Sequence, residues 1–438
     1  MDKIIIRGGR PLYGDVRISG AKNAALPLMA ASLLTKGTVV LNNVPQLSDV
    51  VTMSHLLMNH GVKLSLCGMD ENARSGHRLF LNASNIGNFE APYEMVKKMR
   101  ASVLVLGPLV ARFGFARVSM PGGCAIGARP VDLHVQAMRD LGAEVDLHDG
   151  YIEVSARNGL RGGEITFPVI SVGATENAIM AATLASGKTV IHNAAKEPEI
   201  IDLCKLLSAM GAKIQGAGSS KIEIEGVSEL YGATHTVIFD RIEAGTYAVA
   251  AIITGGELVL KDIDHRFFEN ISDAISEVGG KFSKISNNSV KVSSTDIRSK
   301  IDLTTSAYPG FPTDMQAQLM ALLSVSSGLS TITESIFENR FMHVPELNRM
   351  GADIKIKNGI ANIQGVPHLS GAEVMATDLR ASVSLVLAGL AAKGETVVNR
   401  VYHLDRGYEK LEEKLSKCGA MIFRSSSVIN IVEKPHIE

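Results

Sequence analysis

The sequence predicts an α/β protein with two domains, built from six copies of one structural unit. The chain has 438 residues, which is too many for a single ordinary hydrophobic core. Hydrophobic residues make up 46% of the chain and charged residues 20%, as in a globular protein. Two short phrases that contain glycine alternate along the chain, and each occurs six times. Six matched pairs at nearly constant spacing indicate six units that each contain a βαβ element.

The first phrase is an apolar helix followed by glycine, a small residue and the start of a strand. Its glycines are Gly61, Gly142, Gly211, Gly279, Gly351 and Gly419, which by subtraction are 81, 69, 68, 72 and 68 residues apart. Each stands where the end of a helix requires a left-handed residue, a conformation that glycine adopts without steric cost. The helices before these glycines have one apolar face, so we expect their other face to meet water. The segment 197–210, with a proline and two acids in its first turn, is an example.

The second phrase is a helix of small residues that runs into glycine and then into a β-rich segment. Its glycines are Gly37, Gly114, Gly187, Gly256, Gly328 and Gly394. The helices before them have almost no polar face, which predicts that they are buried on all sides. Three units in each domain would place three buried helices inside a shell of sheets and outer helices. A solenoid is the alternative, but solenoid helices are rarely apolar all round.

Composition and spacing exclude several classes of function. The net charge is −1, so no overall basic field favours nucleic acid, and an anion site must be a local cluster of lysine and arginine. The histidines and cysteines show no spacing typical of a metal site, and no phosphate loop or dinucleotide-binding motif is present. We therefore predict no metal, no cofactor and no nucleic-acid partner.

Membrane insertion and secretion are also not indicated. The longest apolar stretches, 101–111 and 383–392, fall short of the roughly 18–20 residues that span a bilayer. The N-terminal segment MDKIIIRGG is typical of a strand and not of a signal peptide. The sequence therefore predicts a cytoplasmic protein.

A loop rich in glycine and proline, residues 120–134, carries the most reactive candidate, Cys124. A nearby cation such as Arg129 lowers the pKa of a thiol from about 8.5, so the group can serve as acid, base or nucleophile near neutral pH. An inert cysteine in a turn is the alternative. A buried structural cysteine belongs on an apolar stripe, as Cys204 and Cys418 do. We therefore predict that Cys124 is reactive.

Two further candidates stand at the starts of helices that we expect to be buried. Lys22 and Asn23 offer a cation and an amide beside free backbone N–H groups, a combination that binds anions. A solvated lysine is the alternative. Asp314 follows Pro312 and Thr313, and local sequence alone favours an ordinary N-cap aspartate at this position.

Arginines occur in four charged segments, which contain Arg100, Arg340, Asp378 with Arg380, and Arg406. A single exposed arginine is usually only solvated. Arg380 and Arg406, however, stand at predicted helix N-termini, where a cation is unfavourable unless an anion lies nearby. These two positions indicate an anionic ligand.

Several of these segments, in this order, resemble the UDP-N-acetylglucosamine enolpyruvyl transferase family. The most specific are ISGAKNAALP, PGGCAIGARPVDLH, FPTDMQAQ, FENRFMHVPEL, ATDLRAS and HLDRGYE, and the resemblance runs from Ile4 to Val432. It implies an inside-out α/β barrel, in which two similar domains each hold three βαβαββ units. It places residues 22–238 in one domain and residues 1–21 and 239–438 in the other, with the site between them.

The resemblance also implies a reaction. The family transfers the enolpyruvyl group of phosphoenolpyruvate to the 3-hydroxyl of UDP-N-acetylglucosamine and releases phosphate by addition and elimination. This is the first committed step of peptidoglycan synthesis. The nearest rival is the sister transferase that makes 5-enolpyruvylshikimate-3-phosphate, which lacks the cysteine loop. A catalytically silent paralogue that binds the UDP-sugar is a rival of another class.

The implied roles follow residue by residue. Cys124 matches the acid, which is also the target of fosfomycin, and lies on a loop expected to close over the site as a lid. Asp314 matches the base. Lys22, Arg129 and Arg406 match the phosphate clamp, Arg340 and Arg380 lie nearer the carboxylate, and Asn23 orients the intermediate. The other expected substrate contacts are Arg100, Pro130, Val131, Asp132, Leu133, Ser171, Val172, Gly173, Ile336 and Asp378. One departure is Val169, where many members have lysine.

Overall fold

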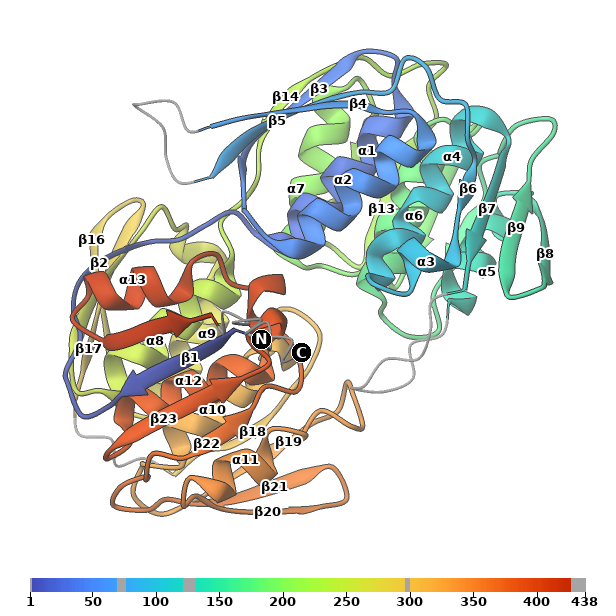
Figure 1. The fold of residues 1–438 in the computed structure, drawn as a ribbon. Coiled ribbons are helices and arrows are strands. Elements are labelled where there is room, and N and C mark those ends of the chain that lie inside the picture. The colour runs from blue at the N-terminus through green and yellow to red at the C-terminus, as the bar shows by residue number, and fades with distance from the viewer. Residues whose placement is uncertain (1, 69–75, 121–130, 296–299, 427–438) are drawn as a thin grey trace, which may run out of the picture.

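The computed structural model describes residues 2–68, 76–120, 131–295 and 300–426, and it folds into two lobes (Figure 1). Six sheets of four strands form within these residues, three in each lobe. Each sheet contains one parallel pair at an edge and two antiparallel pairs, so the six sheets repeat one topology. The predicted α/β class with six repeated units is confirmed. The sheets stay separate, and the described residues form no closed barrel.

The strands of the first lobe come from one continuous stretch of chain. They form sheet β14-β3-β5-β4 (Thr234–Thr236, Thr38–Val44, His77–Asn82 and Lys63–Cys67), sheet β6-β7-β9-β8 (Glu90–Ala91, Phe115–Ser119, Tyr151–Ser155 and Glu144–His148) and sheet β10-β11-β13-β12 (Glu164–Thr166, Lys188–His192, Lys221–Glu225 and Lys213–Gln215).

The second lobe combines the first two strands with the second half of the chain. Its sheets are β22-β23-β1-β24 (Glu373–Met375, Glu395–Asn399, Lys3–Arg7 and Met421–Ser425), β16-β17-β15-β2 (Gly280–Ser286, Ser289–Ser294, Glu257–Lys261 and Tyr13–Arg17) and β18-β19-β21-β20 (Asp302–Thr304, Leu329–Thr333, Ile360–Gln364 and Asp353–Lys357). Strand β1 therefore pairs with strands that follow it by almost the whole chain length.

Three helices at the centre of each lobe are almost wholly buried, as their small apolar residues predict. They are α1 (Lys22–Ala31), α4 (Leu106–Phe113) and α6 (Val172–Ala182) in the first lobe, and α8 (Arg241–Ile253), α10 (Gln316–Leu323) and α12 (Ala381–Ala391) in the second. Small residues let these helices approach closely. The backbone N–H of Gly107 in α4 donates to Asn177 Oδ1 in α6 at 2.7 Å, and a Cβ at Gly107 would lie 2.4 Å from that oxygen.

Six outer helices alternate with the buried ones along the chain. They are α2 (Ser48–His60), α5 (Asp132–Asp140), α7 (Pro198–Ala209), α9 (Glu269–Glu277), α11 (Val344–Arg349) and α13 (Leu411–Lys417), and a short helix, α3 (Tyr93–Val96), precedes α4. The glycine that follows each of the six has φ between 84° and 109°, which confirms the predicted left-handed helix ends.

Helix α7 departs from the expectation of a water-facing polar side. The acids at its start, Glu197, Glu199 and Asp202, are all less than 10% exposed. Two of them contact the second lobe: Glu199 Oε1 lies 3.3 Å from Arg241 Nε, and Glu197 Oε1 accepts a hydrogen bond from the backbone N–H of Tyr308 at 3.3 Å. The prediction that Glu197 and Glu199 face water is wrong because the polar start of α7 meets the other lobe.

Two separate hydrophobic cores support the predicted division of the chain into domains. One core draws its residues from 21–237, and the other from 4–18 and 239–422. The chain crosses between them twice, side by side, where Ala21 N donates to Ile238 O at 2.7 Å and Asp240 N donates to Ser19 O at 2.8 Å. The boundary between residues 238 and 239 remains a proposal that fits these cores. The boundary between residues 21 and 22 also remains a proposal, although Ala21 itself packs in the first core. None of the described helices has the length and apolar character needed to cross a lipid bilayer.

Candidate active site

A buried cluster of charged side chains lies where the two lobes meet. Lys22, the first residue of α1, is 7% exposed, and its Nζ lies 3.3 Å from Asp49 Oδ2 in α2. From Ala24 onward α1 is apolar and packed in the core, and Lys22 at its first position is buried with it. The alternative of a solvated lysine is therefore wrong.

Asp49 was missed by sequence reasoning, yet it connects the lobes. Its Oδ1 accepts from Arg406 Nε at 2.9 Å, and Arg406 Nη2 lies 3.4 Å from Oδ2. The prediction that Arg406 stands at a helix N-terminus is wrong, because Arg406 ends the 3₁₀ helix η5 (Val401–Arg406) of the second lobe. In the sequence, Asp49 looks like any acid in the first turn of a helix, and no local signal distinguishes it.

Burial and neighbouring charges shift the pKa values of this pair. Burial lowers the pKa of Lys22 and outweighs the opposite effect of Asp49. Burial alone would raise the pKa of Asp49, but the charge of Lys22 and the hydrogen bond from Arg406 lower it below its usual value. Asp49 is therefore ionised, and Lys22 is a cation that loses its proton more readily than an exposed lysine.

Asp314 lies in a second group of charges, on the 3₁₀ helix η4 (Thr313–Met315) at the start of α10. Its Oδ1 accepts from Arg340 Nη2 at 2.6 Å, and its Oδ2 lies 3.6 Å from Arg380 Nε. The N-cap residues of η4 and α10 are Pro312 and Met315, so the interpretation of Asp314 as an ordinary N-cap is wrong. Burial tends to raise the pKa of Asp314, but Arg340 and Arg380 hold it well below its usual range.

Arg380 is fixed from several sides and is 2% exposed. Its Nη2 donates to Asp240 Oδ2 and its Nη1 to the backbone carbonyl of Gly407, both at 3.2 Å. The neighbouring Asp378 accepts at Oδ1 from the backbone N–H groups of Arg380 and Ala381, both at 2.8 Å, and so caps α12. Its second oxygen, Oδ2, is buried without a hydrogen-bond partner among the described residues.

A further group of predicted contacts gathers around His134 in the first lobe. Burial first, and then the charge of Arg100, lowers the pKa of His134 to about 3. Gly173, in the first turn of α6, faces the same ring, and a Cβ there would lie 3.3 Å from His134 Cε1. Ser171 caps α6 by accepting from Ala174 N at 3.3 Å, which leaves the N–H groups of Val172 and Gly173 at the helix start. The start of η2 (Arg100–Val105) and the starts of α5 and α6 therefore lie together.

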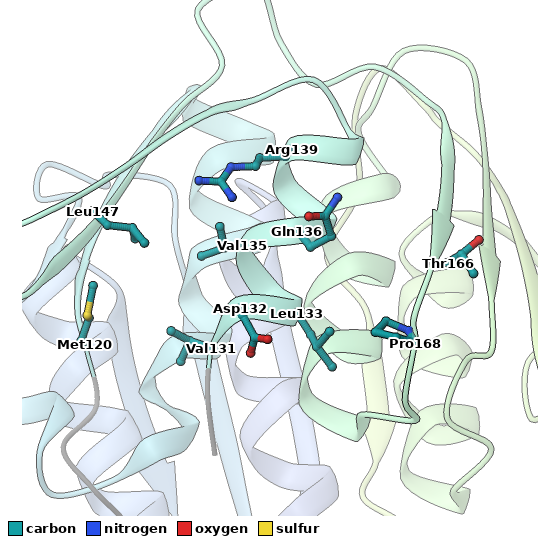
Figure 2. Close-up of a pocket in the computed structure, with 10 residues that line it drawn as sticks. All are labelled: Met120, Val131, Asp132, Leu133, Val135, Gln136, Arg139, Leu147, Thr166 and Pro168. Atoms are coloured by element: carbon teal, nitrogen blue, oxygen red, sulfur yellow. The ribbon is translucent and has the colours of Figure 1, made fainter. Parts of the chain in front are cut away.

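A pocket of about 750 Å³ opens beside this group (Figure 2). Val131, Asp132 and Leu133, predicted as substrate contacts, line it. Sequence reasoning missed its other lining residues, which are Met120, Val135, Gln136, Arg139, Leu147, Thr166 and Pro168. The volume is in the range of pockets that take small-molecule ligands.

The remaining predicted positions divide into three sets. Cys124, Arg129 and Pro130 lie outside the described residues, as does the lid predicted around them. Asn23, next to Lys22, is partly exposed. Ile336 and Val169 are 40% and 62% exposed. No group of metal-binding side chains suited to an ion occurs among the residues that the structure describes.

Comparison with known proteins decides the family. Residues 6–415 match the family of EPSP synthase (3-phosphoshikimate 1-carboxyvinyltransferase). The chain is 57% identical to UDP-N-acetylglucosamine 1-carboxyvinyltransferase of Paramagnetospirillum magneticum, over 97% of this chain and 98% of that protein. It is 56% identical to the protein of the same name in Zymomonas mobilis, over 97% and 99%. The chain belongs to the UDP-N-acetylglucosamine 1-carboxyvinyltransferase family.

Solved structures agree with this family membership. The enolpyruvyl transferase NikO from Streptomyces tendae superposes with a TM-score of 0.84 at 25% identity, over 97% of this chain and 99% of that one. EPSP synthase from Acinetobacter baumannii superposes with a TM-score of 0.73 at 17% identity, over 97% and 100%, which shows the shared fold alone. The resemblance to enolpyruvyl transferases seen in the sequence is thus confirmed, and the chain is a transferase.

Proposed function

We propose that this protein transfers the enolpyruvyl group of phosphoenolpyruvate to the 3-hydroxyl of UDP-N-acetylglucosamine and releases phosphate. One observation carries the proposal: four cations, Lys22, Arg340, Arg380 and Arg406, surround two carboxylates where the lobes meet. Phosphoenolpyruvate carries a phosphate and a carboxylate, and binding both requires such a concentration of cations. The names of the relatives supply the acceptor.

The chemistry assigns a task to each group. An acid protonates the methylene carbon of phosphoenolpyruvate, C2 becomes electrophilic, and the sugar oxygen bonds to it. Elimination then removes a proton from the new methyl group and expels phosphate. Asp314, which its arginines keep ionised, is the proposed base that accepts the hydroxyl proton, and Cys124 is the proposed acid.

The cations divide between the two ends of the donor. Lys22 and Arg406 both form ion pairs with Asp49, and we propose that they hold the phosphate together with Arg129. Arg340 and Arg380 both form ion pairs with Asp314, and we propose that they hold the carboxylate of phosphoenolpyruvate. Asn23, beside Lys22, would orient the intermediate. Asp378 is also a proposed substrate contact, through its Oδ2 atom, which has no hydrogen-bond partner among the described residues.

The proposed acceptor subsite is the pocket of Figure 2 together with the helix starts beside it. The N–H groups of Val172 and Gly173 stand in the first turn of α6, where they have no partner within the helix, and they suit a phosphate of the nucleotide. Arg100 adds positive charge to the same end of the lobe. The remaining proposed contacts are Pro130, Val131, Asp132, Leu133, Ser171 and Ile336.

This activity would place the protein at the first committed step of peptidoglycan synthesis. We therefore propose that it works in the cytoplasm and that its loss impairs cell-wall formation, cell shape and cell division. Fosfomycin is the proposed inhibitor, through Cys124.

Phosphate release by the purified protein tests the proposal. With phosphoenolpyruvate and UDP-N-acetylglucosamine we expect phosphate in equal amount to a product whose mass corresponds to the enolpyruvyl sugar nucleotide. With shikimate 3-phosphate as acceptor we expect no release. Release with shikimate 3-phosphate alone would favour the sister transferase, and absence of release with both acceptors would refute the proposal.

A further inference from the structure

Asp49 stands between two cations that come from different lobes. Its side chain is 5% exposed. Lys22 Nζ lies 3.3 Å from Oδ2, and Arg406 Nε lies 2.9 Å from Oδ1. We infer that Asp49 is a positioning residue, which holds Lys22 and Arg406 together as one phosphate-binding pair and joins the lobes at that pair. The inference rests on the proposed function, because it concerns the phosphate of the enolpyruvyl donor.

The surroundings explain why a carboxylate is needed here. Lys22 is buried, and the charges that act on it are those of Asp49 and Asp314, which are negative, and of Arg380 and Arg406, which are positive. Without Asp49 the nearest negative charge is lost, while both arginines remain. Two cations brought together without a counter-ion repel one another, and burial strengthens the repulsion. The phosphate pair would then be disordered before the donor arrives.

The position of Asp49 on its helix allows both contacts. Asp49 is the second residue of α2, which packs against α1 in the first lobe and against η5 in the second. The preceding residue adds to the connection, because Ser48 Oγ donates to the backbone carbonyl of Asp405 at 3.3 Å. The start of α2 is therefore held by both lobes.

The two ends of the donor site differ in this respect. Asp314 and its partners Arg340 and Arg380 all belong to the second lobe, so that group forms without the first lobe. The phosphate pair forms only when both lobes contribute. Loss of Asp49 should therefore weaken binding of the phosphate end and leave the acceptor pocket of Figure 2 unaffected.

The opposite possibility is that Asp49 occupies the position of the phosphate and must be displaced. Asp49 would then compete with the donor, and its neutralisation would tighten binding. An ion pair that serves stability alone would change neither binding constant. For a variant without the charge of Asp49, a positioning role predicts weaker donor binding, competition predicts tighter donor binding, and a role in stability alone predicts no change.

The test compares Asp49→Asn with Asp49→Glu and with the wild-type protein. For Asp49→Asn we expect the KM for phosphoenolpyruvate to rise by about tenfold or more, as for loss of one partner of a buried charged hydrogen bond. The KM for UDP-N-acetylglucosamine should stay within about twofold, since no contact to the acceptor pocket changes. Asp49→Glu, which keeps the charge, should recover most of the donor binding.

A matched control is Asp202→Asn. Asp202 is also a buried aspartate near the start of an outer helix of the first lobe, and it accepts from His235 Nε2 at 2.9 Å and from the backbone N–H of Ile238 at 3.1 Å. Its substitution removes a buried carboxylate without touching the phosphate pair, so both KM values should stay at the wild-type level. Thermal unfolding of all variants separates loss of structure from loss of positioning.

A pH profile supplies a readout that a purely structural role would not move. Asp49 raises the pKa of Lys22, against burial and against Arg380 and Arg406. In Asp49→Asn, Lys22 should lose its proton at lower pH, so donor binding should fail at lower pH on the alkaline side. If Asp49→Asn does not fold, Asp49→Ser removes the same charge with a smaller side chain.

Calorimetric titration with inorganic phosphate separates this inference from the proposed function. Phosphate should bind the wild-type protein and the Asp202→Asn control, and should bind Asp49→Asn at least about tenfold more weakly. Equal or tighter binding to Asp49→Asn would overturn the role of Asp49, whether or not the protein turns over. Absence of turnover by a wild-type protein that binds phosphate would instead overturn the proposed function.

Discussion

Replacement of Asp314 by asparagine isolates the charge of the proposed base. Asparagine has nearly the same shape as aspartate. Its Oδ1 can keep the hydrogen bond that Arg340 Nη2 donates to Asp314 Oδ1 at 2.6 Å in the wild-type protein. The negative charge and the ability to take a proton are lost, and an NH2 group replaces the oxygen that lies 3.6 Å from Arg380 Nε. We expect turnover to fall because a neutral amide cannot accept the proton of the sugar hydroxyl.

The size of the effect follows from two separate costs. A positioned general base contributes about 10²- to 10⁴-fold in rate, which corresponds to about 3–5.5 kcal/mol in the activation barrier. The cost in stability is smaller, because the Asp314 side chain is 25% exposed and Arg380 keeps its bonds to Asp240 and Gly407. We expect a loss of about 1–2 kcal/mol, or about 2–8 °C in Tm for a domain of this size.

Three measurements check this prediction together. Phosphate release gives kcat, calorimetry gives the affinity for UDP-N-acetylglucosamine, and thermal unfolding gives Tm. A fall in kcat of at least a hundredfold with near-normal sugar affinity supports the assignment. A kcat within tenfold of the wild-type value would remove Asp314 as the base. A sugar affinity lost together with kcat would show that the carboxylate binds the acceptor and does not act as the base.

Three further predictions concern the thiol, a buried histidine and the helix packing. Cys124→Ser should lose most turnover and all labelling by fosfomycin in peptide mass spectrometry; an unlabelled wild-type Cys124 would contradict the thiol assignment. His134, with a pKa of about 3 in the folded protein, contributes stability that is complete above the unfolded value near 6.5 and is lost at about 1.4 kcal/mol per pH unit as pH falls. Urea unfolding should therefore show His134→Gln losing about 2 kcal/mol less than the wild-type protein between pH 7 and pH 5, and equal losses would contradict this. Gly107→Ala places a Cβ 2.4 Å from Asn177 Oδ1 and should cost about 1–3 kcal/mol in the free energy of unfolding. Gly87→Ala, where no atom lies within 4 Å, is its control and should cost little.

The repeat was readable because its markers are local. A left-handed glycine at a helix end, such as Gly211, has a physical cause within a few residues of the chain. The burial of the apolar helices could be predicted for the same reason, because a helix that is buried on all sides has no polar face in its own sequence. The pairing of β1 with β23 and β24 has no local marker, and the place of the first strands in the second lobe came only from resemblance to a family.

The site was predictable where the residue type itself was unusual for its position. Lys22 and Arg380 were found because a cation at the start of a buried helix needs an explanation. Asp49 and Glu199 were missed or misplaced for the opposite reason, because an acid in a first helical turn is ordinary. Their roles depend on Arg406 and Arg241, which reach them from the other lobe. Such contacts exist only after the lobes assemble, so a single sequence does not contain them as a pattern.

The position of β1 has a consequence for the order in which the protein is made. Every strand of the first lobe lies between residues 38 and 236, so that lobe can complete its sheets while the ribosome is still translating the second half. Strand β1 must wait for partners such as Glu395, which pairs with Arg7 across 388 residues of chain. At the usual pace of synthesis this is a delay of roughly 20–80 s. During that time the apolar residues Ile4–Ile6 remain unpaired and can bind chaperones, while the first lobe can already be folded.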